Sequence, residues 1–126
     1  MRRERTDQGS VVEAVLVIPV MMVILLLVIQ CALWAHAAQV AQLAASEGDR
    51  AARSPGGGVA AGVGRAQSVL SGPGSDVASA SAVVSMLPGG QAQITVTGHA
   101  LSILPGLSWP VSATQVGPIQ EFRPSE

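Results

Sequence analysis

Residues 14–35 read AVLVIPVMMVILLLVIQCALWA, and no Asp, Glu, Lys or Arg occurs between Glu13 and Glu47. A helix over this stretch would rise about 33 Å, enough to cross a hydrocarbon core of about 30 Å. A soluble protein seldom needs a helix that is apolar on every face. The stretch therefore predicts a single transmembrane helix surrounded by membrane lipid, and the rest of the chain is organised around it.

The charges at the two ends of this span predict its orientation. Arg2, Arg3 and Arg5 precede the span, whereas the nearest cations beyond it, Arg50 and Arg53, each lie close to an acid. Arginine and lysine near the ends of a span favour the cytoplasmic side. We therefore expect a cytoplasmic N-terminus, an exported C-terminal part and location in the cytoplasmic (inner) membrane.

The composition beyond the span predicts a small domain. About 90 residues follow Ala35, which is enough for one small domain at most. They are rich in Ala, Gly, Ser and Val, with Trp109 and Phe122 as the only aromatic residues. Because such side chains bury little apolar area, we expect the domain to complete its core by packing against the helix or against partner subunits. The net charge of −1 and the absence of lysine argue against a nucleic-acid partner.

Two other interpretations treat the span as a cleaved signal. The sequence Ala35-His36-Ala37 resembles a signal-peptidase site, but a signal h-region usually runs about 7–15 residues and this one is longer. A lipoprotein signal ending at Cys31 would place Gln30 where a small residue is expected. Cys31 is the single cysteine, so it forms no intramolecular disulfide, and we expect it to act as a small buried hydrophobic residue.

The residues in front of the span resemble the N-termini of type IV pilin-like proteins. A basic tail is followed by Gln8, Gly9 and Ser10, then by Glu13, and Pro19 stands early in the apolar run. Over residues 7–52 the chain looks most like the TadE-like family, the minor pilins or pseudopilins of tight-adherence (Flp pilus) secretion systems. The resemblance implies a structural membrane subunit that works with a prepilin peptidase, with other pilus or pseudopilin subunits and with a secretion platform. It implies no cofactor and no small-molecule substrate.

The resemblance also implies a processing region formed by Gln8, Gly9, Ser10 and Glu13. In this class the prepilin peptidase usually cuts after a Gly that leaves Glu at the fifth position of the mature chain. Cleavage after Gly9 would leave Glu13 fourth, and cleavage after Gln8 would leave it fifth but without a preceding Gly. A chain that stays uncut as a plain bitopic protein is the third alternative.

Two roles are open for Glu13. The resemblance implies that it pairs with the new N-terminal amine of a neighbouring subunit, an attraction of about 4 kcal/mol at about 4 Å and an effective dielectric of 20. The alternative is that Glu13 only lies in the headgroup layer, since an acid at the centre of a membrane helix costs roughly 2.5–3.5 kcal/mol. Pro19, likewise, can simply bend the helix.

The helix is expected to continue past the membrane to about Arg53, with Trp34 as an interfacial anchor. Small residues repeat every four positions there, and this spacing lets another helix approach closely. The two series are Ala37, Ala41 and Ala45, and Ala44, Gly48 and Ala52. Glu47 with Arg50, and Asp49 with Arg53, are expected pairs on the helix surface. The candidate assembly and helix-packing residues are therefore Glu13, Pro19, Ala41, Ala45 and Gly48.

Three further elements are expected after the Ser54-Pro55-Gly56-Gly57-Gly58 stretch, which ends the long helix. Helical spacing predicts a short amphipathic helix over residues 59–70. Alternating residues on either side of a turn at residues 88–90 predict a β-hairpin, and residues 109–113 suggest a third strand. The residues expected on the apolar face of the first strand are Ala78, Ala80, Ala82, Val84 and Met86. The tail from Gly117 is expected to be partly extended and exposed.

These elements predict an α+β fold in a reduced pilin-like plan. It consists of a long N-terminal transmembrane helix that extends outside the membrane, a short second helix and a small antiparallel β-sheet. The expected divisions are a cytoplasmic leader or tail at 1–13, the transmembrane helix at 14–35, its extension at 36–53 and a small exported α+β domain with the β-hairpin at 54–126.

The sequence does not support an enzyme or a metal site. No acid accompanies His36 or His99 in the sequence, and ligands in spaced pairs are absent. No serine lies in a Gly-x-Ser-x-Gly elbow, and the glycine run at 56–58 lacks the Gly-Lys-Ser/Thr ending of a phosphate loop. Two functions remain: a minor pilin or pseudopilin of a tight-adherence pilus, and an unprocessed bitopic scaffold protein of a secretion system.

Overall fold

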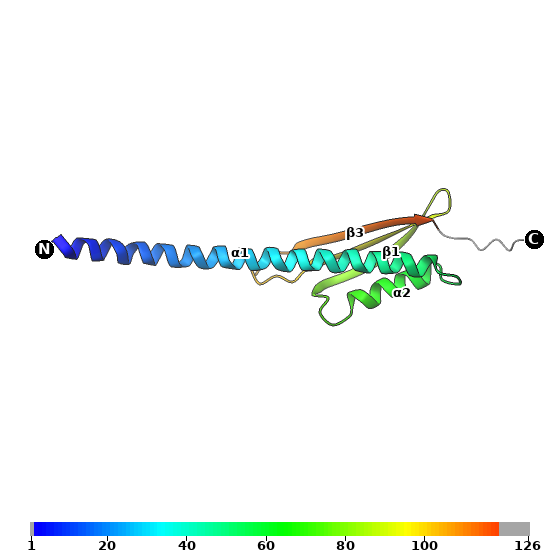
Figure 1. Ribbon diagram of the computed structural model, residues 1–126, viewed down its shortest axis with the longest axis horizontal. Helices are drawn as coiled ribbons and strands as arrows, with labels where there is room; N and C mark the ends of the chain where they lie inside the picture. The colour runs from blue at the N-terminus through cyan, green and yellow to red at the C-terminus, as the bar shows by residue number, and fades with distance from the viewer. Residues whose placement is uncertain (1, 119–126) are drawn as a thin grey trace, which may run out of the picture.

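A computed structural model of the chain describes residues 2–118, with side chains from residue 9 onward. Figure 1 shows α1 as a long rod, with α2 and a small sheet gathered on its C-terminal half. The elements are α1 (Arg2–Arg53), α2 (Val59–Leu70), β1 (Val77–Leu87), β2 (Gln91–Ala100) and β3 (Trp109–Pro118). A long helix, a short helix and a three-stranded antiparallel sheet confirm the α+β fold expected from the sequence.

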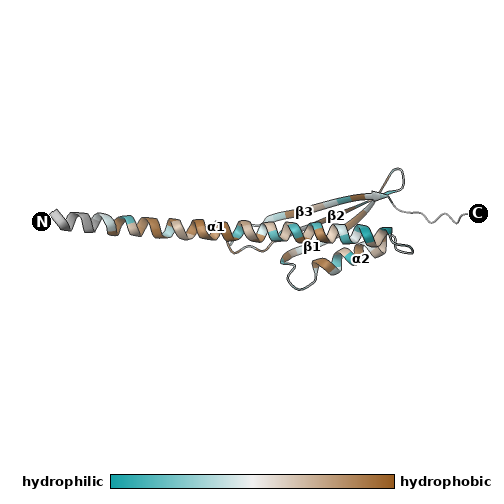
Figure 2. Ribbon diagram, viewed as in Figure 1, coloured by the Kyte–Doolittle hydropathy of each residue, from teal (hydrophilic) through white to brown (hydrophobic). Residues whose placement is uncertain are grey.

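The N-terminal half of α1 projects away from the rest of the molecule. The helix has 52 residues, which corresponds to a length of about 78 Å. Pro19 lies inside it without ending it. This is the one described helix that is long and apolar enough to cross a membrane, and its most apolar window has no buried residue. Figure 2 shows the hydrophobic colour concentrated along this projecting half.

The sheet packs one face against the C-terminal half of α1. The strands lie in the order β1-β2-β3, both pairs antiparallel, so β2 is central. Buried residues on this face come from alternate positions, as the period of two requires. They are Ala82 of β1, Ala92, Ile94, Val96 and Ala100 of β2, and Val111 and Ala113 of β3. The hairpin and the third strand predicted from the sequence are therefore confirmed.

The third strand is longer than expected. We placed the start of an exposed tail at Gly117, but β3 continues to Pro118, and Gly117 is buried opposite Ala92. A Cβ atom at Gly117 would lie 2.7 Å from a carboxylate oxygen of Asp49 on α1. The strand therefore continues because its glycine lets the sheet pack closely against the helix. The rest of the expected tail lies outside the described residues.

A bulge in β1 changes which side chains face the helix. The pairing shifts between Ala78, which lies opposite His99, and Ser81, which lies opposite Thr97. Ser79 has a φ of 51°, in the left-handed region. Because a bulge inserts one extra residue, it reverses the alternation of faces along the strand. The prediction that Ala78 shares a face with Ala80 and Ala82 is therefore wrong, and Ala78 is exposed on the opposite face.

The core is formed mainly by the small side chains of α1. Ala41, Ala44 and Ala45 are fully buried and pack in one cluster with Ile94 and Val96 of the sheet. Helix α2 covers the other side of this cluster with Ala66 and Leu70. The expectation that the domain completes its core by packing against the long helix is confirmed.

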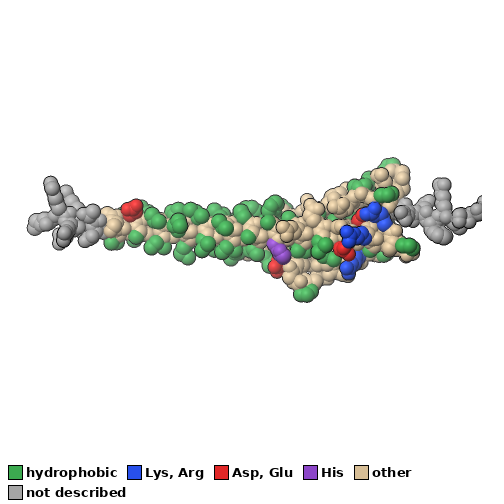
Figure 3. Space-filling view, viewed as in Figure 1, with side chains coloured by type: hydrophobic (Ala, Val, Ile, Leu, Met, Phe, Trp, Pro, Cys, Tyr) green, Lys and Arg blue, Asp and Glu red, His purple; other side chains and the backbone are tan. Residues whose placement is uncertain are grey.

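Charged side chains gather at the end of α1 that is far from the projecting half (Figure 3). Glu47 pairs with Arg50 at 3.3 Å and with Arg65 of α2 at 3.4 Å. Asp49 pairs with Arg53 one turn further along the same helix. Both pairs that the sequence predicted within this helix are confirmed.

Candidate functional site

The predicted processing region lies on the projecting end of α1. Gly9 and Ser10 are exposed, and Glu13 is exposed one turn further along the helix. Gln8 is helical, but its side chain lies outside the described residues. Gly9, Ser10 and Glu13 are therefore accessible from outside the molecule and far from the sheet. Their role in processing stays a prediction.

Glu13 stands at the edge of a wide apolar band. Among the described residues of α1, Glu47 is the next charged side chain along the helix, about 51 Å away at 1.5 Å per residue. Figure 3 shows the acidic group near the projecting end, followed by hydrophobic side chains. The carboxylate therefore marks one boundary of the apolar segment.

The apolar band is exposed on all sides of the helix. A large exposed apolar surface marks contact with a membrane or another protein, and a helix of this length can span a bilayer. The chain alone leaves this surface uncovered and so requires lipid or neighbouring helices around it. The exposed large side chains are Val11, Val12, Val15, Leu16, Val17, Ile18, Val20, Met21, Met22, Val23, Ile24, Leu25, Leu27, Val28 and Ile29.

The predicted helix-packing residues divide into two groups. Ala41 and Ala45 are fully buried, and a Cβ atom at Gly48 would lie 2.9 Å from the carbonyl oxygen of Gly62 on α2. The helix that approaches the small residues is therefore α2 of the same chain. Pro19, by contrast, lies exposed on the projecting half, and any part that it plays in assembly stays a prediction.

Gln30 connects α1 to the loop between β2 and β3, and no functional role was predicted for it from the sequence. It is fully buried, its Nε2 donates to the carbonyl oxygen of Leu101, and its Oε1 accepts from the amide of Ile103, both at 3.1 Å. The available signal was that Gln30 is the only amide side chain in the apolar stretch. One turn later, Trp34 Nε1 donates to the carbonyl oxygen of Pro110 at 3.3 Å.

His36 has an acidic neighbour that the sequence did not reveal. Its Nε2 lies 3.0 Å from the carbonyl oxygen of Gly74 and 3.9 Å from Oδ2 of Asp76, because the α2–β1 loop folds back onto α1. The expectation that no acid accompanies His36 is therefore wrong. The described residues contain no cluster of three or more His, Cys, Asp or Glu side chains that could hold a metal ion.

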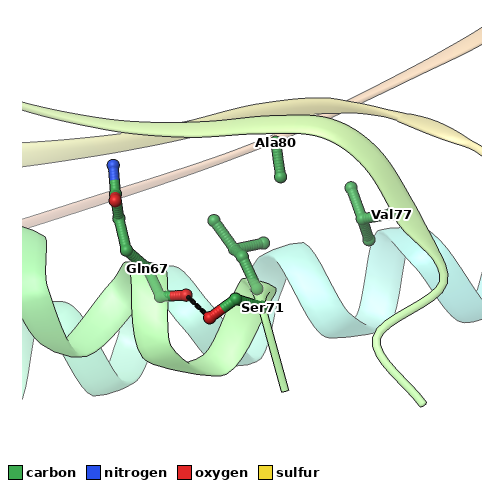
Figure 4. Close-up of a pocket in the computed structure, with 5 residues that line it drawn as sticks. Gln67, Ser71, Val77 and Ala80 are labelled. Carbon is green, nitrogen blue, oxygen red and sulfur yellow. Dashed lines mark hydrogen bonds between the residues drawn. The ribbon is translucent and has the colours of Figure 1, made fainter. Parts of the chain in front are cut away.

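A hollow of about 300 Å³ lies between α2 and β1 (Figure 4). Its lining has no ionisable side chain, and the Ser71 hydroxyl donates to the carbonyl oxygen of Gln67 at the end of α2. The side chains of this lining therefore include no general acid or base that could activate the Ser71 hydroxyl. Its lining residues are Gln67, Leu70, Ser71, Val77 and Ala80.

The comparison with protein families matches the projecting helix. The model described as TadE-like protein matches residues 9–50. No match was found among curated proteins or among solved structures. The matched region begins at the predicted processing region, includes the apolar band and ends near the end of α1. The resemblance predicted from the sequence is thus confirmed: residues 9–50 are similar to the TadE-like family.

Proposed function

We propose that the chain is a membrane-anchored structural subunit of a tight-adherence (Flp) pilus assembly or secretion system, acting as a minor pilin or pseudopilin. The observation that carries this proposal is the coincidence of two features in one segment. The TadE-like match covers residues 9–50, and the same segment contains the helix that can cross a membrane.

The proposed arrangement assigns one role to each part of the chain. Residues 1–13 form a cytoplasmic leader or tail, 14–35 cross the inner membrane, 36–53 extend the helix and 54–126 form the exported domain. The projecting half of α1 is uncovered, while residues 36–53 carry the sheet and α2. Charge placement favours this orientation, because three arginines precede the span.

The proposed partners are membrane lipid, a prepilin peptidase, other pilus or pseudopilin subunits and the secretion platform. The exposed apolar band supports lipid and helix partners, since it needs a covering in water. TadE-like pilus components are structural proteins. We accordingly assign the chain no catalytic role, cofactor, nucleic-acid partner or small-molecule substrate.

A second function is favoured by one detail of the N-terminal sequence. Cleavage after Gly9 would leave Glu13 at the fourth position, whereas prepilins of this class usually carry Glu at the fifth. An uncut chain would act as a bitopic scaffold of the same secretion system. The two functions differ in whether the arginine-containing leader is lost.

The intact mass of the protein from membranes distinguishes the two functions. In cells that express the prepilin peptidase, we expect the mass to fall by that of a leader ending at Gln8 or Gly9. The matched control is the same chain from cells without the peptidase, which should keep the leader. A chain that retains Arg2 in both kinds of cell would contradict the pilin assignment and support the bitopic scaffold.

A further inference from the structure

The loop between β2 and β3 exposes apolar side chains at an unusual place. Residues 101–108 read LSILPGLS and contain no charged residue. Leu101, Ile103 and Leu107 are each 45–47% exposed. Figure 1 shows that this connection reaches further toward the projecting half of α1 than the rest of the sheet. The loop therefore forms the end of the domain that faces the projecting half of α1, where the proposed arrangement has the helix leave the membrane.

The depth of this loop follows from the helix to which it is bonded. If Glu13 lies at one face of the bilayer, a hydrocarbon core of about 30 Å extends over about 20 residues of helix, to about residue 33. A tilt of about 20° moves this boundary further along by about one residue. Gln30, whose side chain forms hydrogen bonds with the loop, lies about three residues on the membrane side of this boundary, which is roughly 5 Å along the helix. The apolar surface of the loop is therefore continuous with the lipid-facing surface of the span.

Several backbone groups of the loop have hydrogen-bond partners within the protein, as an environment with little water requires. In lipid, a backbone N–H or C=O group needs a partner within the protein. The Gln30 side chain donates to the carbonyl oxygen of Leu101 and accepts from the amide of Ile103. The hydroxyl of Ser102 donates to the carbonyl oxygen of Leu104 at 2.7 Å. The amide of Leu107 donates to the same carbonyl at 3.4 Å. Several polar groups of the loop are thus satisfied while its leucine and isoleucine side chains stay exposed.

We propose that residues 101–108 insert into the lipid interface on the exported side and give the domain a second contact with the bilayer. Leu101, Ile103 and Leu107 would enter the boundary between headgroups and acyl chains, a layer in which apolar faces typically lie about 5–10 Å deep. Trp34, which is 42% exposed one turn after Gln30, lies at the level where interfacial tryptophans are enriched. The inference rests on the membrane anchor of the proposed function, and it adds that the domain is held against the membrane.

Quenching by lipid nitroxides tests this contact. The full chain with Cys31→Ser and Ile103→Cys is labelled with an environment-sensitive fluorophore. It is reconstituted in phosphatidylcholine–phosphatidylglycerol vesicles that carry a nitroxide near the headgroup or at the chain end. Leu25→Cys, within the span, is the positive control. Val83→Cys is the negative control, because Val83 is an apolar residue on β1 that is 58% exposed, somewhat more than Ile103, and lies away from the proposed contact. Leu107→Cys repeats the test with a second position on the loop.

We expect the labels at Ile103 and Leu107 to be quenched several-fold more by the shallow nitroxide than the label at Val83. Quenching equal to that at Val83, while Leu25 is quenched, would overturn the inference and leave the anchor intact. An unquenched Leu25 would overturn the membrane anchor as well. Disulfide-linked dimers of the unlabelled Ile103→Cys chain, together with no quenching of the labelled chain by lipid, would overturn the inference by assigning the loop to a second copy of the chain.

Discussion

At the scale of single residues, Glu13 separates two accounts of the N-terminal region. An acid at the centre of a membrane helix costs roughly 2.5–3.5 kcal/mol, so Glu13 fits the edge of the span in either account. Only in the pilin account does the carboxylate also attract the N-terminal amine of a neighbouring subunit. This attraction amounts to about 4 kcal/mol at close range before the cost of desolvation. Neutralising the side chain distinguishes these accounts.

We predict that Glu13→Gln leaves insertion and cleavage intact and reduces recruitment into the pilus assembly. The substitution keeps the size and polarity of the side chain and removes only its charge. If about 1.4 kcal/mol of net pairing is lost, co-purification with the other pilus components should fall about tenfold. The control is Glu47→Gln, which makes the same change where the carboxylate pairs with the exposed Arg50 and Arg65 and little energy is expected. Recovery of Glu13→Gln at the wild-type level would contradict the pairing.

Single residues also show where prediction from the sequence was limited. The acid beside His36 was missed because Asp76 lies 40 positions away in the chain and approaches only through the α2–β1 loop. Gln30 was visible as a polar residue in an apolar run, but its partners are backbone groups of a loop more than 70 positions away. Both contacts depend on the tertiary arrangement, which no local pattern encodes.

At the scale of elements, the contact between α1 and α2 depends on glycines at their closest approach. A Cβ atom at Gly48 would meet the Gly62 carbonyl at 2.9 Å and the Ala66 side chain at 3.1 Å. Backbone atoms of a packed helix cannot move aside without shifting the element. Gly48 therefore sets the distance between the two helices and with it the place of α2 on the core.

We predict that Gly48→Ala lowers the free energy of unfolding of the domain formed by α2, the sheet and the C-terminal half of α1 by about 1–3 kcal/mol, as overpacking does. The control is Gly64→Ala on α2, where a Cβ atom would have nothing within 4 Å. That substitution should stabilise the domain by about 0.4–1 kcal/mol, because alanine favours the helix. The thermal transition of Trp34 and Trp109 fluorescence in detergent measures both. Equal stability of the two variants would contradict the close helix contact.

Local sequence signals predicted the helices but not the bulge in β1. The end of α1 at Arg53 and the bounds of α2 followed from local signals, namely Pro55, the glycine run and the apolar spacing over residues 59–70. The bulge at Ser79 could not be predicted, because the alternation of small and polar residues continues across it without a break. A two-residue period records which positions alternate, but not where the pairing with the neighbouring strand shifts.

At the scale of the whole molecule, the chain is a rod with a small domain on one half. The projecting half exposes its large apolar side chains, while the other half buries its alanines under the sheet and α2. The long charge-free stretch was enough to predict this division. It did not reveal that Gln30, within the expected span, forms a hydrogen bond with the loop between β2 and β3. The start of the domain depends on this contact between segments that are distant in the sequence.

The central claim is that the projecting half lies in the membrane while the domain lies outside it. Single-cysteine accessibility in spheroplasts tests this most directly, with Cys31→Ser as the background and a membrane-impermeant maleimide as the reagent. We predict that Ser54→Cys, exposed after the end of α1, is labelled from outside, and that Leu25→Cys reacts only after detergent is added. Leu25→Cys labelled as fast as Ser54→Cys in intact spheroplasts, or Ser54→Cys labelled only after lysis, would contradict the account.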